Sequence, residues 1–316
     1  MSKLSLAASA AFVLSTSVAW ACTDIPESHV QKVDVGYTAV NQDIKLRRVI
    51  VHNADPKGTV LLLHGFPETM CAWVDVSLKL GEDYDVHAID WPGYGRSTRP
   101  PAEDFSYAPK AYADVLKAYI ETARIRKDEL VIYATDVAAL PVLLLALEDP
   151  RIAQTIIVGD FAPFNRPDYM YETLQNLKLH ALAEQTHAFM NKNRDDILEN
   201  AYRRGLPKDV QFDISPAFKA DMYEGWKRGG NDLSRRLFHY YSNFTRDQDF
   251  FESNLANLKT RVKVVWGEND TYIKKEMGIE FARKANAELN LLPGIGHYPH
   301  LQDPERTVEE IRASFR

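Results

Sequence analysis

The carboxylate of Asp136 occupies a position from which it could act as a nucleophile. It follows an apolar run over 130–133 that predicts a buried strand, and it precedes a helix-forming run over 138–147. Small residues, Ala134 and Ala138, flank it two positions away on either side, as a sharp strand-to-helix turn requires. Such a turn would present the carboxylate at a helix N-terminus, where backbone N–H groups favour negative charge. An ordinary helix N-cap is the alternative interpretation, since Asp is a preferred N-cap residue.

His297 and an acid that follows a later strand could complete a catalytic set with Asp136. A carboxylate nucleophile forms an ester with an electrophilic carbon, and a histidine then takes a proton from the water that hydrolyses the ester. A carboxylate on the other imidazole nitrogen fixes the tautomer and stabilises the imidazolium. His297 lies in a loop near the C-terminus, after the predicted strand 262–266 and the aspartate behind it, Asp270. The order nucleophile, acid and histidine therefore predicts hydrolysis through a covalent ester.

The loop after an apolar predicted strand could supply a donor for the oxyanion that forms during ester hydrolysis. It contains His64, Gly65, Phe66 and Pro67, and we expect the Phe66 N–H to be one donor. The N–H that follows the nucleophile, that of Val137, is the second. Such donors are commonly worth about 3–4 kcal/mol each. A plain strand-to-helix turn is the alternative interpretation of the Gly and Pro in this loop.

Strand-like and helix-like runs alternate along most of the chain, which predicts a mostly parallel sheet covered by helices on both faces. The predicted strands lie at 33–40, 44–52, 59–63, 84–89, 130–133, 155–158, 262–266 and 288–291. Between 162 and 246 the chain is rich in charged and aromatic residues and lacks a clear strand. We therefore predict a core formed by 22–161 and 247–316, with 162–246 inserted as a helical lid over the edge of the sheet where ligands bind.

Residues 1–21 have the pattern of a secretory signal peptide. Lys3 is the positively charged residue, 4–18 is a short run of apolar and small residues, and Ala19-Trp20-Ala21 fits a cleavage site. We expect export to the periplasm or the exterior, with a mature chain that begins near Cys22 and has no membrane span. An uncleaved anchor and a lipoprotein are the alternatives.

Composition limits the partners that the chain can have. Its 316 residues are 45% hydrophobic and carry a formal net charge of −6, which suits one large domain or a core with an insertion. The sequence has no long basic run, so we expect no nucleic-acid partner. It also lacks metal-ligand spacing and a dinucleotide fingerprint, so we expect no metal or cofactor. The two cysteines, Cys22 and Cys71, could form a disulfide or remain thiols.

Five motifs along nearly the whole mature chain resemble those of the α/β-hydrolase superfamily. They are His64-Gly65-Phe66-Pro67-Glu68, Asp90-x-Pro92-Gly93-x-Gly95-x-Ser97, the Asp136 turn, Trp266-Gly267-x-x-Asp270 and Gly294-x-Gly296-His297-x-Pro299. Within the superfamily the chain is most similar to epoxide hydrolases and to haloalkane or haloacid dehalogenases. The resemblance implies the α/β-hydrolase fold with an inserted helical lid, and an alkyl-ester intermediate on Asp136.

The resemblance implies two places for the triad acid. Most epoxide hydrolases have it at the position of Asp270, which we favour, whereas some dehalogenases and a secreted epoxide-hydrolase branch have it at that of Asp160. Haloalkane dehalogenases usually have Trp directly after the nucleophile, where this chain has Val137. Fluoroacetate-type dehalogenases have Arg residues shortly after it, where 138–141 offer no charge. We therefore expect a small, apolar and uncharged substrate.

Epoxide opening needs a proton donor, which the resemblance places in the lid. The segment 238–243 is similar to the family motif that carries a donor tyrosine, and we assign Tyr241 to this role with Tyr240 as the fallback. A His–Tyr type of donor pair would add His187. The competitors for that second position are His180, Tyr169 and Tyr171. Aromatic side chains that we expect to line an apolar pocket are Phe66, Trp73, Trp91 and Phe161.

The leading hypothesis from the sequence is an exported, cofactor-independent epoxide hydrolase. A haloalkane or haloacid dehalogenase of the same fold is the second hypothesis, and halide release without diol formation would favour it. A ligand-binding homologue that has lost turnover is the third, and an inert protein that still binds apolar ligands would favour it.

Overall fold

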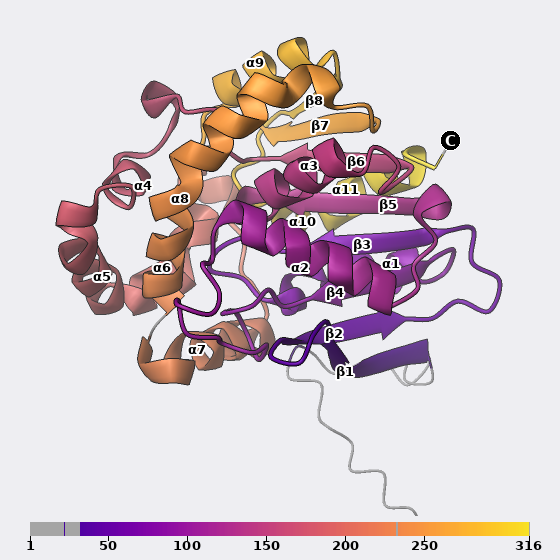
Figure 1. The fold of residues 1–316 in the computed structure, drawn as a ribbon, viewed down its shortest axis with the longest axis horizontal. Coiled ribbons are helices and arrows are strands. Elements are labelled where there is room, and N and C mark those ends of the chain that lie inside the picture. Colours follow the sequence, from indigo (N-terminus) through magenta and orange to yellow (C-terminus); the bar gives the residue numbers. More distant parts are fainter. Residues whose placement is uncertain (1–21, 23–31, 232, 316) are drawn as a thin grey trace, which may run out of the picture.

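An eight-stranded sheet forms the centre of the molecule (Figure 1). The computed structural model describes Cys22, residues 32–231 and residues 233–315. The strands are β1 (Val33–Ala39), β2 (Lys45–Val51), β3 (Thr59–Leu63), β4 (Asp85–Ile89), β5 (Leu130–Thr135), β6 (Thr155–Gly159), β7 (Val262–Gly267) and β8 (Glu288–Leu292). Their order is β1-β2-β4-β3-β5-β6-β7-β8. Strand β2 is antiparallel to both neighbours and all other pairs are parallel, which confirms the predicted mostly parallel sheet.

Helices cover both faces of this sheet, as the alternation of runs predicts. The α-helices are α1 (Val74–Leu80), α2 (Pro109–Thr122), α3 (Ala139–Glu148), α4 (Glu172–Asn176), α5 (Ala183–Lys192), α6 (Arg194–Asn200), α7 (Pro216–Asn231), α8 (Leu233–Asn254), α9 (Lys275–Ala285), α10 (Pro299–Gln302) and α11 (Pro304–Ala313). In Figure 1, α2, α3 and α8 lie in front of the sheet, while α1 and α11 pack together behind it.

The central strands are buried on both faces, because a layer of helices lies on each side of them. Every residue of β5 and β6 is buried, which explains their continuous apolar runs. Helix α3 lies against the sheet and also contacts α2 and α8, and its residues 139–146 are all buried. A helix enclosed in this way is apolar all round and lacks a polar face.

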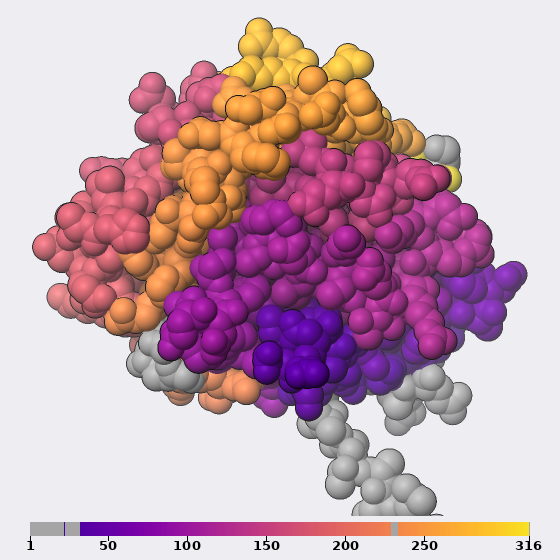
Figure 2. Space-filling view, in the orientation of Figure 1, coloured from indigo at the N-terminus to yellow at the C-terminus, as the bar shows by residue number. Residues whose placement is uncertain are grey.

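Helices α4–α7 gather at one end of the sheet and form a cap on the core (Figure 1). Helix α8 continues from this cap across the core as a diagonal band (Figure 2), so the predicted boundary at residue 246 falls inside a helix. None of the helices within the described part of the chain is long and apolar enough to cross a membrane. The predicted signal peptide, residues 1–21, lies outside the described residues.

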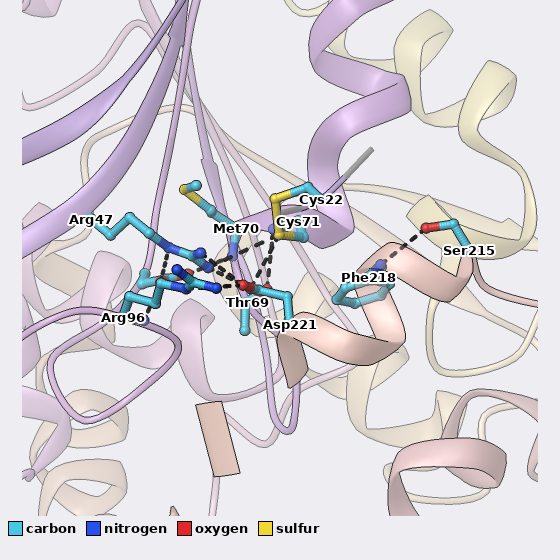
Figure 3. Close-up of a disulfide and its surroundings, with 10 residues drawn as sticks. Cys22, Arg47, Thr69, Met70, Cys71, Arg96, Ser215, Phe218 and Asp221 are labelled. Carbon is cyan, nitrogen blue, oxygen red and sulfur yellow. Dashed lines mark hydrogen bonds and ion pairs between the residues drawn. A yellow bond between two sulfur atoms is a disulfide. The ribbon is translucent and has the colours of Figure 1, made fainter. Parts of the chain in front are cut away.

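A buried ionic cluster joins the cap to the core. Arg47 on β2 donates from Nε to Asp90 Oδ2 at 2.5 Å and from Nη1 to Asp221 Oδ1, on α7, at 2.8 Å. The Cys22–Cys71 disulfide lies beside this cluster, with Cys71 Sγ 3.2 Å from Asp221 Oδ2 (Figure 3). The two cysteines, whose pairing the sequence left open, therefore form a disulfide, and this disulfide lies beside the contact between cap and core.

Candidate active site

Asp136 directly follows β5, in a strained turn that only small neighbours permit. Its φ of 51° lies in the left-handed region, which is unusual for a residue with a side chain. Ala134 and Ala138 are fully buried on either side of it. A Cβ atom at Gly65 would lie 2.7 Å from the Asp136 Cβ, so glycine is required where the neighbouring loop approaches the turn. The side chain of Asp136 nevertheless remains 15% exposed and faces a cavity.

The structure brings Asp136, His297 and Asp270 together from three separate segments. His297 Nε2 is 3.3 Å from Asp136 Oδ2, and His297 Nδ1 is 2.7 Å from Asp270 Oδ2. The other oxygen of Asp270 accepts from the N–H groups of Tyr272 at 2.7 Å and Ile273 at 3.1 Å. Asp270 is thus fixed by its own turn, and it orients the imidazole toward Asp136.

Asp160, the other candidate acid, lies behind this triad. It follows β6, is fully buried and has a φ of 52°. Its Oδ1 accepts from the Gly267 N–H at 3.0 Å. Atoms of Asp160, Asp270 and His297 that could hold a metal ion lie within 4.8 Å of one another. The hydrogen bond between His297 and Asp270 occupies two of these atoms, so the arrangement suits an acid–base triad.

Electrostatics set the protonation of the histidine and of the nearest phenol. Burial by itself lowers the pKa of His297, but the charge of Asp270 and the hydrogen bonds with Asp136 and Asp270 raise that pKa well above its usual value. Burial and the charge of Asp136 raise the pKa of Tyr241 well above 10. The two neighbouring carboxyl groups therefore favour the protonated form of His297, and the Tyr241 phenol keeps its proton.

A hydrogen-bonded loop presents the Phe66 N–H to the nucleophile. This N–H donates to Asp136 Oδ1 at 2.8 Å. His64 lies within 2.8 Å of the Gly65 carbonyl through Nδ1, and its Nε2 accepts from the Trp91 N–H at 3.3 Å. Burial lowers the pKa of His64, so this ring is neutral and serves to hold the loop.

A buried Glu–His pair supports the same loop from the other side. Glu68 Oε2 accepts from the Gly65 N–H at 2.8 Å, and Glu68 Oε1 is 2.7 Å from His300 Nε2. Trp73 stacks on the His300 ring with centroids 4.2 Å apart. The sequence analysis assigned no role to Glu68 or His300, although each lies within three residues of a predicted site residue. The predicted pocket residue Trp73 is placed against this pair and outside the cavity lining.

The cavity above Asp136 has a volume of about 180 Å³ and is enclosed mainly by cap side chains. Its predicted lining residues are Phe66, Asp136, Val137, Tyr171, Tyr241 and His297. Lining residues that the sequence analysis did not single out include Leu174, Met190, Asp196, Arg204, Tyr272 and Tyr298. Tyr298 directly follows His297, a signal that the sequence offers, whereas no motif marks the cap residues.

The two lid tyrosines occupy different environments. The Tyr240 hydroxyl donates to the Val137 carbonyl at 3.0 Å, so its proton is engaged. Tyr241 lines the cavity, and its hydroxyl has no hydrogen-bond partner among the described residues. A small recess beside Asp136 is lined by both tyrosines and by Phe161. Of Tyr240 and Tyr241, it is therefore Tyr241 that can donate to a molecule in the cavity.

The structure does not bring His187 into the cavity. Its Nδ1 lies 2.6 Å from Ser234 Oγ, and its ring also lies near the Asn191 amide. The competing His180 is exposed and contacts the Phe238 ring. Pro67 lines only a minor recess beneath the cap, and Trp91 does not line the cavity above Asp136. The packing of the cap helices determines where these side chains lie, and a short sequence motif does not predict that packing.

Comparisons with known proteins find proteins that are similar in sequence and in fold. Epoxide hydrolase 1 of Caenorhabditis elegans is 23% identical over 85% of this chain and 68% of its own length. The solved structure of an epoxide hydrolase from Vigna radiata matches with a TM-score of 0.72 and 20% identity, over 90% of this chain and 98% of that one. A haloalkane dehalogenase loop variant from Bradyrhizobium elkanii matches with a TM-score of 0.73 and 17% identity, over 90% and 97% of the two chains.

Structural matches at these identities show a shared fold and leave the reaction open. The chain also matches a family model described as the alpha/beta hydrolase family, over residues 60–310. That span runs from β3 through the nucleophile turn to the histidine loop. With its strained Asp136 turn and its histidine supplied by a C-terminal loop, the chain belongs to the α/β-hydrolase family.

Proposed function

We propose that the protein is an epoxide hydrolase that acts through an ester on Asp136. The observation that carries the proposal is the position of the Asp136 carboxylate, which lies between the Phe66 N–H and the His297 ring at the base of an enclosed cavity. A carboxylate in this place can attack carbon, and the imidazole is within reach of a water held at the resulting ester.

The first step forms the ester and opens the epoxide ring. The Asp136 carboxylate attacks an epoxide carbon, and the C–O bond of the ring breaks with its electron pair on oxygen. Tyr241 gives its proton to that oxygen, because its hydroxyl faces the cavity and its raised pKa keeps it protonated. The products of this step are a hydroxyalkyl ester of Asp136 and a tyrosinate.

The second step hydrolyses the ester. His297 takes a proton from water, the hydroxide attacks the ester carbonyl, and the N–H groups of Phe66 and Val137 stabilise the oxyanion. The bond between the acyl carbon and the alkoxy oxygen then breaks, and His297 protonates the departing diol oxygen. Asp136 is restored, and solvent returns a proton to Tyr241 as the second proton of the water is released. One epoxide and one water thus give one diol.

The electrostatics suit this order of events. The negative charges of Asp136 and Asp270 both raise the pKa of His297 in the free enzyme. Ester formation removes the charge of Asp136, so the pKa of His297 falls in the intermediate and the ring releases its proton to solvent. The imidazole therefore becomes a base at the step that requires one.

A dehalogenase remains the second candidate, since it would use the same ester. No indole N–H lines the described part of the cavity, and Val137 follows the nucleophile, so the indole donor that holds halide in haloalkane dehalogenases has no counterpart there. Protonation by a cavity-facing phenol suits an alkoxide leaving group better than a halide. Arg204 and Asp196 at the cavity lining add one charge of each sign, which is compatible with an uncharged substrate.

The test is to trap the ester in a His297→Gln variant, which keeps the nucleophile and removes the base. We expect incubation with styrene oxide to add the mass of the epoxide to the peptide that contains Asp136. A 1-haloalkane of similar size and a phenyl ester serve as competing probes. Absence of an adduct on Asp136 with every probe that the wild type turns over would refute the mechanism. Halide release by the wild type without any diol formation would instead identify a dehalogenase.

Asp136→Asn is the matched control, because it has the same shape and no nucleophilic charge. We expect it to remain folded, to give no adduct and to lose turnover. Inert wild-type protein that still bound the probes would support the hypothesis of a ligand-binding homologue.

We further propose that the protein is exported. Residues 1–21 have the signal-peptide pattern, and the Cys22–Cys71 disulfide is of a kind that persists in oxidising compartments. Mass spectrometry of protein from a periplasmic or culture fraction should find a chain that begins at or near Cys22. A full-length chain with reduced cysteines in the cytosol would contradict export.

A further inference from the structure

The side chain of Asp160 presents a buried oxygen that the triad does not use. Its Oδ1 accepts one hydrogen bond, from the Gly267 N–H. Its Oδ2 is buried and has no hydrogen-bond partner among the described residues. A buried carboxylate oxygen without a donor is costly, and such a group demands an explanation.

A second carboxyl group, that of Asp270, lies near the carboxyl group of Asp160. Atoms of Asp160, Asp270 and His297 lie within 4.8 Å of one another in a region closed to solvent. The titratable groups that face Asp160 are Asp270, His297 and the phenol of Tyr133, whose own pKa is raised by burial. Burial and mutual repulsion oppose the ionisation of both carboxyl groups at once.

The donors around the two groups decide which one carries the proton. Asp270 accepts from two backbone N–H groups and from His297, which together stabilise its negative charge. Asp160 accepts from a single backbone N–H. Asp270 is therefore the ionised member of the pair and Asp160 the neutral one.

We propose that Asp160 is a positioning residue of the triad, a neutral carboxylic acid whose Oδ2–H donates to the carboxylate of Asp270. Protonation turns the unpartnered acceptor into a donor, so it resolves the buried oxygen that nothing else satisfies. The added hydrogen bond holds Asp270 against His297 without adding a second negative charge. Burial and the charge of Asp270 raise the pKa of Asp160 well above its usual value, in agreement with this assignment.

Infrared difference spectroscopy on the intact protein tests the protonation state directly. We expect wild type near pH 7 to show the carbonyl stretch of a buried carboxylic acid, and Asp160→Asn to lack it. Glu310→Gln is the matched control, because Glu310 is a buried carboxylate paired with Lys263 and its removal should leave the band intact. Absence of the band from wild type, or its persistence in Asp160→Asn, would overturn the proposal. This measurement does not depend on turnover, so it stands or fails separately from the proposed reaction.

Kinetics then test the positioning role, and this part rests on the proposed function. The amide in Asp160→Asn can donate to Asp270 and accept from Gly267, so we expect kcat and its pH dependence to match wild type. Asp160→Ala lacks the donor, and we expect kcat to fall about tenfold with KM little changed.

The fall of kcat on the acid side of its pH profile, the acid limb, distinguishes a neutral Asp160 from an ionised one. His297 must be neutral to hydrolyse the ester, and an ionised Asp160 would help to raise its pKa. If Asp160 were ionised, Asp160→Asn would therefore move the acid limb to lower pH, by about one unit for a 1.4 kcal/mol interaction. Such a shift would overturn the proposal, as would an Asp160→Ala variant with wild-type kcat. Should Asp160→Ala fail to fold, the Asn variant and the infrared band still decide the question.

Discussion

Replacing Arg47 by methionine should destabilise the protein by about 3 kcal/mol at pH 7. The guanidinium lies between Asp90 and Asp221, and both carboxylates are buried. Removing one partner of a buried ion pair costs about 3–5 kcal/mol, because it leaves an uncompensated charge. The lower end applies here, since Asp221 retains Arg96 at 3.6 Å and Asp90 retains the Met70 N–H at 2.8 Å.

The pH dependence of this loss has a definite sign. Burial alone raises the pKa of Asp90, but the charge and hydrogen bond of Arg47 lower it below its usual value. The ionised Asp90 therefore stabilises wild type above about pH 3.9, which is the pKa of aspartate in the unfolded chain. This stabilisation is lost as the pH falls through the lower pKa that Asp90 has in the folded protein. Without Arg47 the pKa of Asp90 is raised instead, so the variant loses stability as pH rises. The gap between the two proteins should be widest near pH 7 and narrow below about pH 4.

Urea unfolding at several pH values measures this gap, provided that two probes give coincident transitions. Arg126→Met is the control, because Arg126 is 66% exposed and pairs with Glu129 at the surface. We expect the control to lose less than about 1 kcal/mol at every pH. A stability loss of less than about 1 kcal/mol for Arg47→Met at pH 7 would refute the argument. So would a difference in stability between wild type and Arg47→Met that does not change with pH.

Three further outcomes follow from the contacts around the site. Tyr241→Phe should slow ester formation from an epoxide about 100-fold in single-turnover kinetics. Tyr240→Phe should leave that rate within tenfold of wild type and should cost about 1 kcal/mol of stability in unfolding experiments. Equal rates of ester formation in the two variants would contradict the assignment of Tyr241 as the proton donor. Gly65→Ala should lower kcat about 100-fold, because the added Cβ would lie 2.7 Å from the Asp136 Cβ. Gly36→Ala is the control and should match wild type, because the atom nearest to its added Cβ lies 3.5 Å away. Replacing both cysteines by serine removes a crosslink between residues 49 apart in sequence. We expect the unfolding free energy to fall by at most about 4 kcal/mol. An unchanged urea midpoint would show that the crosslink does not stabilise the fold.

The sequence predicted the sheet and the sharp turn at Asp136 because both depend on local patterns. A strand buried on both faces must be apolar throughout, so the run at 130–133 marked β5 without knowledge of its neighbours. A sharp turn after such a strand requires small residues around Asp136, and these are visible at a fixed spacing. The histidine loop was recognisable from a local pattern too, since Gly294 and Gly296 precede His297.

The tertiary structure decided the matters that depend on how distant segments pack. Two aspartates follow neighbouring strands, and only their positions relative to the imidazole distinguish Asp270, which contacts it, from Asp160, which lies behind it. The placement of Tyr241 toward the cavity and of His187 away from it depends on the rotation of the cap helices. That rotation is set by many weak apolar contacts spread over the cap, and a local sequence pattern does not encode their sum.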